Sequence, residues 1–120
     1  MYDHVSLKVK DFAKSKRFYE KALAPLGLKV QSADAASAGF GAGDTTGLWI
    51  SQESPAVTGV HVAFAAPNRA AVKAFHVAAM EAGGRDNGAP GVRESYAPTY
   101  YAAFVYAPDG NNIEAVCHSK

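Results

Sequence analysis

The sequence repeats itself at an offset of 57 residues, and this repeat constrains the fold more than any other feature. Shifting the chain by that offset gives seven identities between residues 4 and 27 without a gap, beginning with His4-Val5 over His61-Val62. A fixed internal period indicates two copies of one supersecondary unit. We therefore predict two similar modules, about residues 1–54 and 58–120, within a single domain of residues 1–120.

Each module begins with a segment in which apolar and polar residues alternate. In residues 4–9, and again in residues 60–65, every second side chain is apolar. Side chains on a strand point alternately to its two faces, so the apolar set predicts one packed face per strand. His4 and His61 then lie on the opposite face and project away from the core.

A helix is expected after each of these strands. Asp11 and Asn68 are suited to cap the two helices, because their short side chains can accept a hydrogen bond from a first-turn N–H group. Gly27 and Gly83 are suited to end them. Further strands are predicted at residues 28–33, 38–41 and 47–52 in the first module and at residues 100–106 and 112–118 in the second.

Residues 85–99 contain two glycines and two prolines and are expected to form mostly loop. The predicted fold class is α+β, with two strand–helix–three-strand modules. Each sheet has one face under its helix and one open face. Two such open faces, meeting edge to edge, would form a curved mixed sheet around a cavity.

Composition excludes several classes of protein. The 120 residues include 12 Lys+Arg and 11 Asp+Glu, and the net charge of +1 provides no general attraction to nucleic acid or to an anionic membrane. Cys117 is the single cysteine, which excludes a disulfide framework. No apolar run approaches the roughly 20 residues that span a bilayer. We expect a cytoplasmic protein with neither nucleic acid nor membrane as a partner.

The last predicted strand carries a carboxylate in its middle. Alternation over residues 112–116 places Glu114 on the cavity face, opposite the apolar residues of the strand. Burying a carboxylate without a partner is costly, so a compensating charge is expected. A divalent cation bound by His4, His61 and Glu114 would supply it. Two imidazoles and one carboxylate suit Fe(II), Mn(II), Zn(II) or Ni(II).

Five further residues are candidates for contacting a small-molecule ligand, because they are aromatic or basic and lie on the strands or in the long loop. These are Trp49, Arg93, Tyr96, Tyr100 and Phe104. Tyr100 and Phe104 share one face of their strand. Parity does not decide whether that face lines the cavity, because it does not determine the register of the hairpin.

Two segments of the sequence resemble a known family, the vicinal oxygen chelate superfamily. They are the opening Asp3-His4-Val5-Ser6-Leu7-Lys8-Val9 and the closing Pro108-Asp109-Gly110-Asn111-Asn112-Ile113-Glu114. The family includes glyoxalase I, bleomycin-resistance proteins, fosfomycin-resistance enzymes and extradiol dioxygenases, and the resemblance covers the whole chain. It implies paired βαβββ modules with metal ligands on their first and last strands, which by position are His4, His61 and Glu114. It also implies a homodimer, in which His4 can join His61 and Glu114 of a partner chain.

The sequence departs from two branches of that family. Glyoxalase I-like members place an acid on the last strand of the first module, where residues 47–52 have none. Fosfomycin-modifying members carry a tyrosine at the position of Phe104. These departures argue against lactoylglutathione lyase activity and against fosfomycin modification.

We expect a divalent-metal-dependent enzyme that acts by Lewis-acid catalysis on a small substrate with two neighbouring oxygens. A lyase, an isomerase and a dioxygenase-like activity are all compatible with this site, and the sequence singles out no separate catalytic residue. The alternative is a metal-free protein that binds and sequesters a small molecule, as bleomycin-resistance proteins do.

Overall fold

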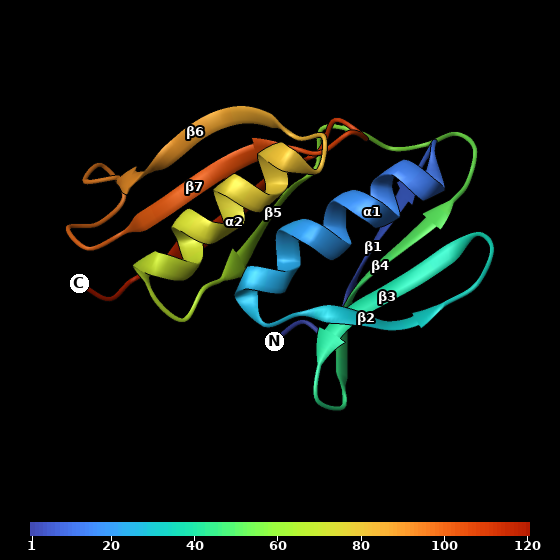
Figure 1. Ribbon diagram of the computed structural model, residues 1–120, viewed down its shortest axis with the longest axis horizontal. Helices are drawn as coiled ribbons and strands as arrows, with labels where there is room; N and C mark the ends of the chain where they lie inside the picture. Colours follow the sequence, from blue (N-terminus) through green and yellow to red (C-terminus); the bar gives the residue numbers. More distant parts are fainter.

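The computed structural model describes residues 1–120 and contains two modules of the same design (Figure 1). Each module runs strand, helix and three strands, so the predicted α+β class is confirmed. The elements of the first are β1 (Val5–Val9), α1 (Phe12–Leu23), the short 3-10 helix η1 (Ala24–Leu26), β2 (Lys29–Ala33), β3 (Ser37–Ala42) and β4 (Thr45–Gln52). Those of the second are β5 (His61–Ala65), α2 (Arg69–Glu81), β6 (Arg85–Val92), β7 (Tyr101–Tyr106) and β8 (Asn112–Cys117).

The two sheets have the same topology. Their strand orders are β1-β4-β3-β2 and β5-β8-β7-β6. In each sheet the first strand pairs in parallel with the last, and the other pairings are antiparallel. No hydrogen-bonded pairing joins the two sheets, so β1 and β5 each form an outer edge. The expected curved layer is therefore made of two separate sheets.

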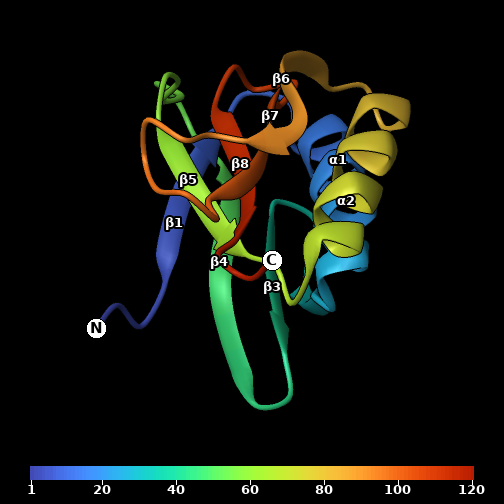
Figure 2. The ribbon, with the colours of Figure 1, turned by 90° about the vertical axis from the view of Figure 1, so that its left-hand side faces the viewer.

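Both helices lie on the same side of the strands, as Figure 2 shows, and leave the opposite faces of the two sheets open. Alternation explains which side chains the helices cover. Leu7 and Val9 of β1 are buried, whereas the alternate residues Ser6 and Lys8 are exposed. The predicted caps are confirmed, because Asp11 accepts a hydrogen bond from Lys14 N and Asn68 accepts one from Ala71 N.

Strand β6 differs from the expectation of a loop. It covers Arg85–Val92 despite its glycines and Pro90, and it pairs with β7. The register shifts twice along this pairing, around Gly88 and before Gly91. Proline and glycine are tolerated there because β6 is an edge strand whose ladder is already interrupted by bulges.

A partly buried hydrogen bond joins the two modules beside the helices. Tyr19 of α1 is fully buried, and its hydroxyl donates to Asp109 Oδ2 in the β7–β8 turn at 2.9 Å. Burial, with the neighbouring Asp109 carboxylate, raises the pKa of Tyr19 far above its usual range, so this hydroxyl remains a donor. Among the helices of the structure, neither length nor apolar character suffices for a membrane span.

Candidate functional site

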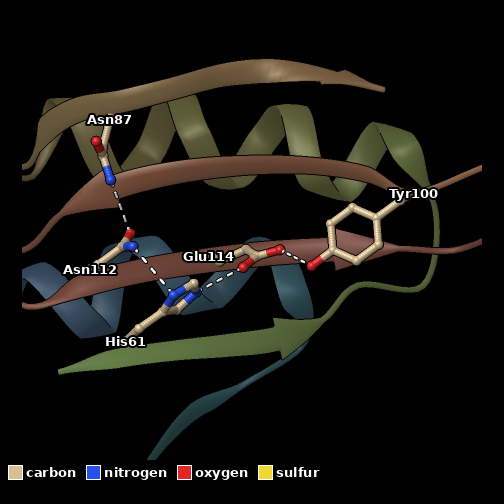
Figure 3. Close-up of polar contacts among 5 residues, drawn as sticks. All are labelled: His61, Asn87, Tyr100, Asn112 and Glu114. Carbon is tan, nitrogen blue, oxygen red and sulfur yellow. Dashed lines mark hydrogen bonds and ion pairs between the residues drawn. The ribbon is translucent and has the colours of Figure 1, made fainter. Parts of the chain in front are cut away.

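The open face of the second sheet brings together a histidine and a buried carboxylate. His61 begins β5 and Glu114 lies in the middle of β8, and the parallel register places Asn112 beside His61 and Glu114 beside Ala63. His61 Nε2 and Glu114 Oε1 are 2.8 Å apart (Figure 3). The Glu114 side chain is only 3% exposed, whereas that of His61 is 47% exposed. The alternation argument therefore placed these two residues on the correct face.

A tyrosine hydroxyl completes the surroundings of this carboxylate. Tyr100 donates a hydrogen bond to Glu114 Oε2, so the two carboxylate oxygens have different partners (Figure 3). Burial, the bond to Glu114 and the charge of its carboxylate together raise the pKa of Tyr100 to about 12. Tyr100 thus stays protonated and donates at neutral pH.

Two amides extend the network on the other side of His61. Asn112 Nδ2 lies 3.4 Å from His61 Nδ1, and Asn112 Oδ1 accepts a hydrogen bond from Asn87 Nδ2 at 3.2 Å. In this arrangement His61 Nδ1 accepts, so Nε2 carries the proton and donates to Glu114. Because both amides can rotate by half a turn, the same residues can also accept a proton on Nδ1.

The register of the β7–β8 hairpin decides which face of β7 borders the site, which alternation along the strand did not determine. Phe104 lies directly opposite Glu114, and residues opposite one another on antiparallel strands share a face. The face with Phe104, and not the one with Tyr101, therefore borders the site. The Phe104 ring meets the His61 ring edge-on, with 6.0 Å between centroids.

The other predicted ligand-contacting residues are divided between the two modules, with Arg93 and Tyr96 after β6 and Trp49 in β4. Tyr96 is 65% exposed and its ring contacts that of Tyr100 at 5.0 Å between centroids. The guanidinium of Arg93 lies over the Phe104 ring. Trp49 lies on the first sheet, where it pairs with Ser6 and Gly39 on the open face. Trp49 is thus on the same side of the strands as Glu114, but on the other module.

His4 does not join His61 and Glu114 within the chain. It immediately precedes β1, is half exposed, and contacts its neighbour Asp3 at 2.7 Å. No three histidine, cysteine, aspartate or glutamate side chains are grouped closely enough in the single chain to hold a metal ion. A site with all three predicted ligands therefore requires His4 from another copy of the protein.

His61 and Glu114 nevertheless fit two neighbouring ligands of one ion. Nitrogen and oxygen ligands lie about 2.0–2.2 Å from a transition-metal ion, which puts neighbouring donor atoms roughly 3 Å apart. Their separation of 2.8 Å agrees with this spacing. The carboxylate has no lysine or arginine partner, so a cation would compensate a buried charge that now has only hydrogen bonds and the imidazole.

The sequence alone indicates neither the bond of Tyr100 to Glu114 nor the place of Asn87 in the network. Tyr100 was selected as an aromatic residue, but its bond to Glu114 depends on the hairpin register. Asn87 was not selected, because it falls in the segment expected to form a loop. Its position next to Asn112 depends on the pairing of β6 with β7 and of β7 with β8, which no local pattern signals.

Comparison with known proteins identifies relatives of the whole chain. Residues 2–115 match the family model described as the Glyoxalase/Bleomycin resistance protein/Dioxygenase superfamily. No curated protein matches the sequence.

Solved structures are similar over nearly the full length. A glyoxalase/bleomycin resistance protein from Albidiferax ferrireducens T118 is 30% identical, with a TM-score of 0.86 over 97% of this chain and 98% of that one. A glyoxalase/bleomycin resistance protein/dioxygenase family enzyme from Burkholderia phytofirmans PsJN is 14% identical, with a TM-score of 0.75 over 98% of each chain. Lactoylglutathione lyase from Agrobacterium tumefaciens is 17% identical, with a TM-score of 0.70 over 97% of this chain and 92% of that one. The last two show likeness of fold alone.

Proposed function

This chain belongs to the Glyoxalase/Bleomycin resistance protein/Dioxygenase superfamily, and we propose that it is a divalent-metal-dependent enzyme acting on a small molecule with two neighbouring oxygen atoms. The observation that carries the proposal is the buried Glu114 carboxylate 2.8 Å from His61 Nε2 on an open sheet face. A bound divalent cation would polarise the substrate oxygens and stabilise negative charge that develops on them.

The residues around Glu114 would hold the two ligands in place. Tyr100 donates to Oε2, which leaves Oε1, the atom nearest His61, to face the ion. Binding through His61 Nε2 requires the proton on Nδ1. Rotation of the Asn112 amide would then present its oxygen to that proton, and Asn87 can rotate with it. Phe104 supplies an apolar surface against the imidazole, which limits access of water from that side.

We assign the third ligand to His4 of a second copy in a homodimer. His4 immediately precedes β1, and β1 and β5 are edge strands of their sheets, as β2 and β6 are at the opposite edges. Unpaired edges are the surfaces on which another chain can pair or pack. A dimer that brings the β1 edge of one copy to the β5 edge of the other would add an imidazole beside Glu114.

The proposal is tested by metal binding to protein freed of metal with chelator. We expect Mn²⁺ titrated by calorimetry to bind the wild type, and His61→Ala and Glu114→Gln to abolish binding because each removes a ligand. His76→Gln is the matched control: His76 pairs with Asp86, away from the Glu114 network, and its loss should leave Mn²⁺ affinity unchanged.

The dimer is tested by mixing His4→Ala with Glu114→Ala protein. In a shared site, each mixed dimer regains one site with all three ligands, so Mn²⁺ binding should return in part. Undiminished binding by His61→Ala or Glu114→Gln would contradict the metal site. If the mixture binds no more Mn²⁺ than the two pure variants do, the site shared between two copies is contradicted, but the metal site itself is not.

A second candidate function is metal-free sequestration of an apolar molecule. A cavity of about 310 Å³ lies between the modules and is lined mostly by hydrophobic residues of β1, β3, β4 and β5, among them Val5, Phe40, Leu48, Val62 and Phe64. Glu114 is not among its lining residues, although Ala63, which pairs with Glu114, is one of them. Ligand binding that persists in excess chelator and is weakened by Phe64→Ala, but not by Glu114→Gln, would favour this function.

A further inference from the structure

Arg93 is held in a fixed position beside the site. Its Nη1 donates to Gly91 O at 2.9 Å and its Nη2 to Ala89 O at 2.8 Å. A Cβ atom added at Gly88 or at Gly91 would lie 3.1 Å from a guanidinium nitrogen, so the bulged strand β6 leaves room for the guanidinium by carrying glycine at both positions. The side chain is thus ordered before any ligand arrives.

The charge of Arg93 has no acidic partner in the chain. None of the four ion pairs of the structure includes it. A guanidinium has five N–H donors, and two backbone carbonyls use two of them. Three donors and the full positive charge are therefore available to a ligand, although the residue is partly buried.

Phe104 connects Arg93 to the candidate metal ligands. The guanidinium carbon lies 5.4 Å from the Phe104 ring centroid, and that centroid lies 6.0 Å from the centroid of His61. Phe104 is also the residue directly opposite Glu114 on the neighbouring strand. The guanidinium and the imidazole therefore lie on the same face of the sheet. The distance between them cannot exceed the sum of those two distances, and a small organic molecule can bridge it.

We propose that Arg93 binds a carboxylate of the substrate, so that the substrate is a small organic anion whose two neighbouring oxygens lie toward His61 and Glu114. This inference rests on the proposed function. The planar guanidinium matches a carboxylate with two parallel N–H···O bonds. The Phe104 ring between the two ends suits an apolar or aromatic body between the carboxylate and the neighbouring oxygens.

The inference is tested with a pair of probes that differ in charge. Protocatechuate carries two neighbouring hydroxyls and a carboxylate on one ring, and protocatechuamide is its neutral amide. Calorimetric titrations without oxygen compare the two on wild-type protein, both loaded with Mn²⁺ and in excess chelator. The variants are Arg93→Gln, Arg93→Lys and, as a control for charge, Arg17→Gln on the exposed side of α1.

We expect Mn²⁺-loaded wild type to bind protocatechuate roughly ten- to hundred-fold more tightly than the amide, as a charge-assisted bidentate contact provides. Arg93→Gln should remove this preference and leave the affinity for the amide unchanged. Arg93→Lys should keep part of the preference, because lysine retains the positive charge but lacks the two parallel N–H donors of a guanidinium. Arg17→Gln should keep all of it.

Equal affinities for the two probes on wild type would overturn the inference whether or not the variants fold. A preference that survives in folded Arg93→Gln would overturn it as well, and so would failure of protocatechuate to bind protein that holds Mn²⁺. Failure of the proposed function is a different result: no Mn²⁺ binds, yet an Arg93-dependent preference for protocatechuate persists in chelator.

Discussion

The Tyr100 hydroxyl donates a hydrogen bond to the Glu114 carboxylate across the β7–β8 hairpin, on the side away from His61. Glu114 therefore has a partner for each oxygen although it is almost fully buried. Side chains that bond a metal ligand from behind determine its orientation and its affinity for the ion. The same contact also contributes to the raised pKa of Tyr100.

Tyr100→Phe should weaken Mn²⁺ binding by about ten- to hundred-fold, the cost commonly found when an outer partner of a ligand is removed. The variant leaves Glu114 Oε2 without a donor and frees the carboxylate to rotate. Calorimetric titration of metal-free protein measures the change. Tyr96→Phe is the control, because that exposed hydroxyl bonds no other residue. Equal losses in both variants would argue against a specific role for Tyr100.

Stability should fall as the pH rises from about 10 toward 12. The pKa of a tyrosine is about 10 in an unfolded chain, and burial raises that of Tyr100 to about 12 in the folded protein. A raised pKa contributes stability that is complete below pH 10 and is lost as the pH rises through the folded value. Tyr19 contributes in the same direction.

Chemical denaturation at a series of alkaline pH values checks this dependence. Tyr100→Phe should make the decline shallower, because one of the two tyrosines whose pKa is raised in the folded protein is gone. Tyr2→Phe, at an exposed position, should leave the slope as in the wild type. A slope that is the same for all three proteins would show that the bond to Glu114 does not govern this ionisation.

Tyr19→Phe should lower the free energy of unfolding by about 1.5–3 kcal/mol, the range for a hydrogen bond to a charged group. The lost bond joins α1 to the Asp109 carboxylate in the β7–β8 turn. Tyr2→Phe, at an 83% exposed position, should change stability little. Urea denaturation compares the two. Mn²⁺ affinity should be unchanged in Tyr19→Phe, because the bond lies on the helix side of the strands.

Gly39→Ala should destabilise the first sheet by about 1–3 kcal/mol, since an added Cβ would lie 2.7 Å from Thr46 Cγ2 and 2.9 Å from the Trp49 ring. The tryptophan must move, so its fluorescence should shift in the folded state. Gly47→Ala is the matched control on the neighbouring strand β4, because nothing lies within 4 Å of its added Cβ. Identical spectra and stabilities for both variants would contradict the close packing of Trp49 on Gly39.

Much of the site could be predicted because strand alternation is a local property. Side chains alternate with a period of two whatever the strand pairs with, so His61 and Glu114 could each be assigned to an open face from their neighbours alone. The 57-residue repeat predicted the two modules on the same basis, since each unit repeats its own pattern of apolar residues. The match of residues 2–115 to the superfamily model agrees with the family that the sequence resembles.

Register and strand pairing, by contrast, depend on contacts between distant parts of the chain. The sequence determined that Tyr100 and Phe104 share a face, but only the pairing of β7 with β8 decided that this face carries Glu114. The pairing of β6 with β7 placed Arg93 over Phe104, and together with the pairing of β7 with β8 it placed Asn87 beside Asn112. A strand's own residues specify its faces, whereas its partner and its register follow from packing and hydrogen bonds across the whole fold.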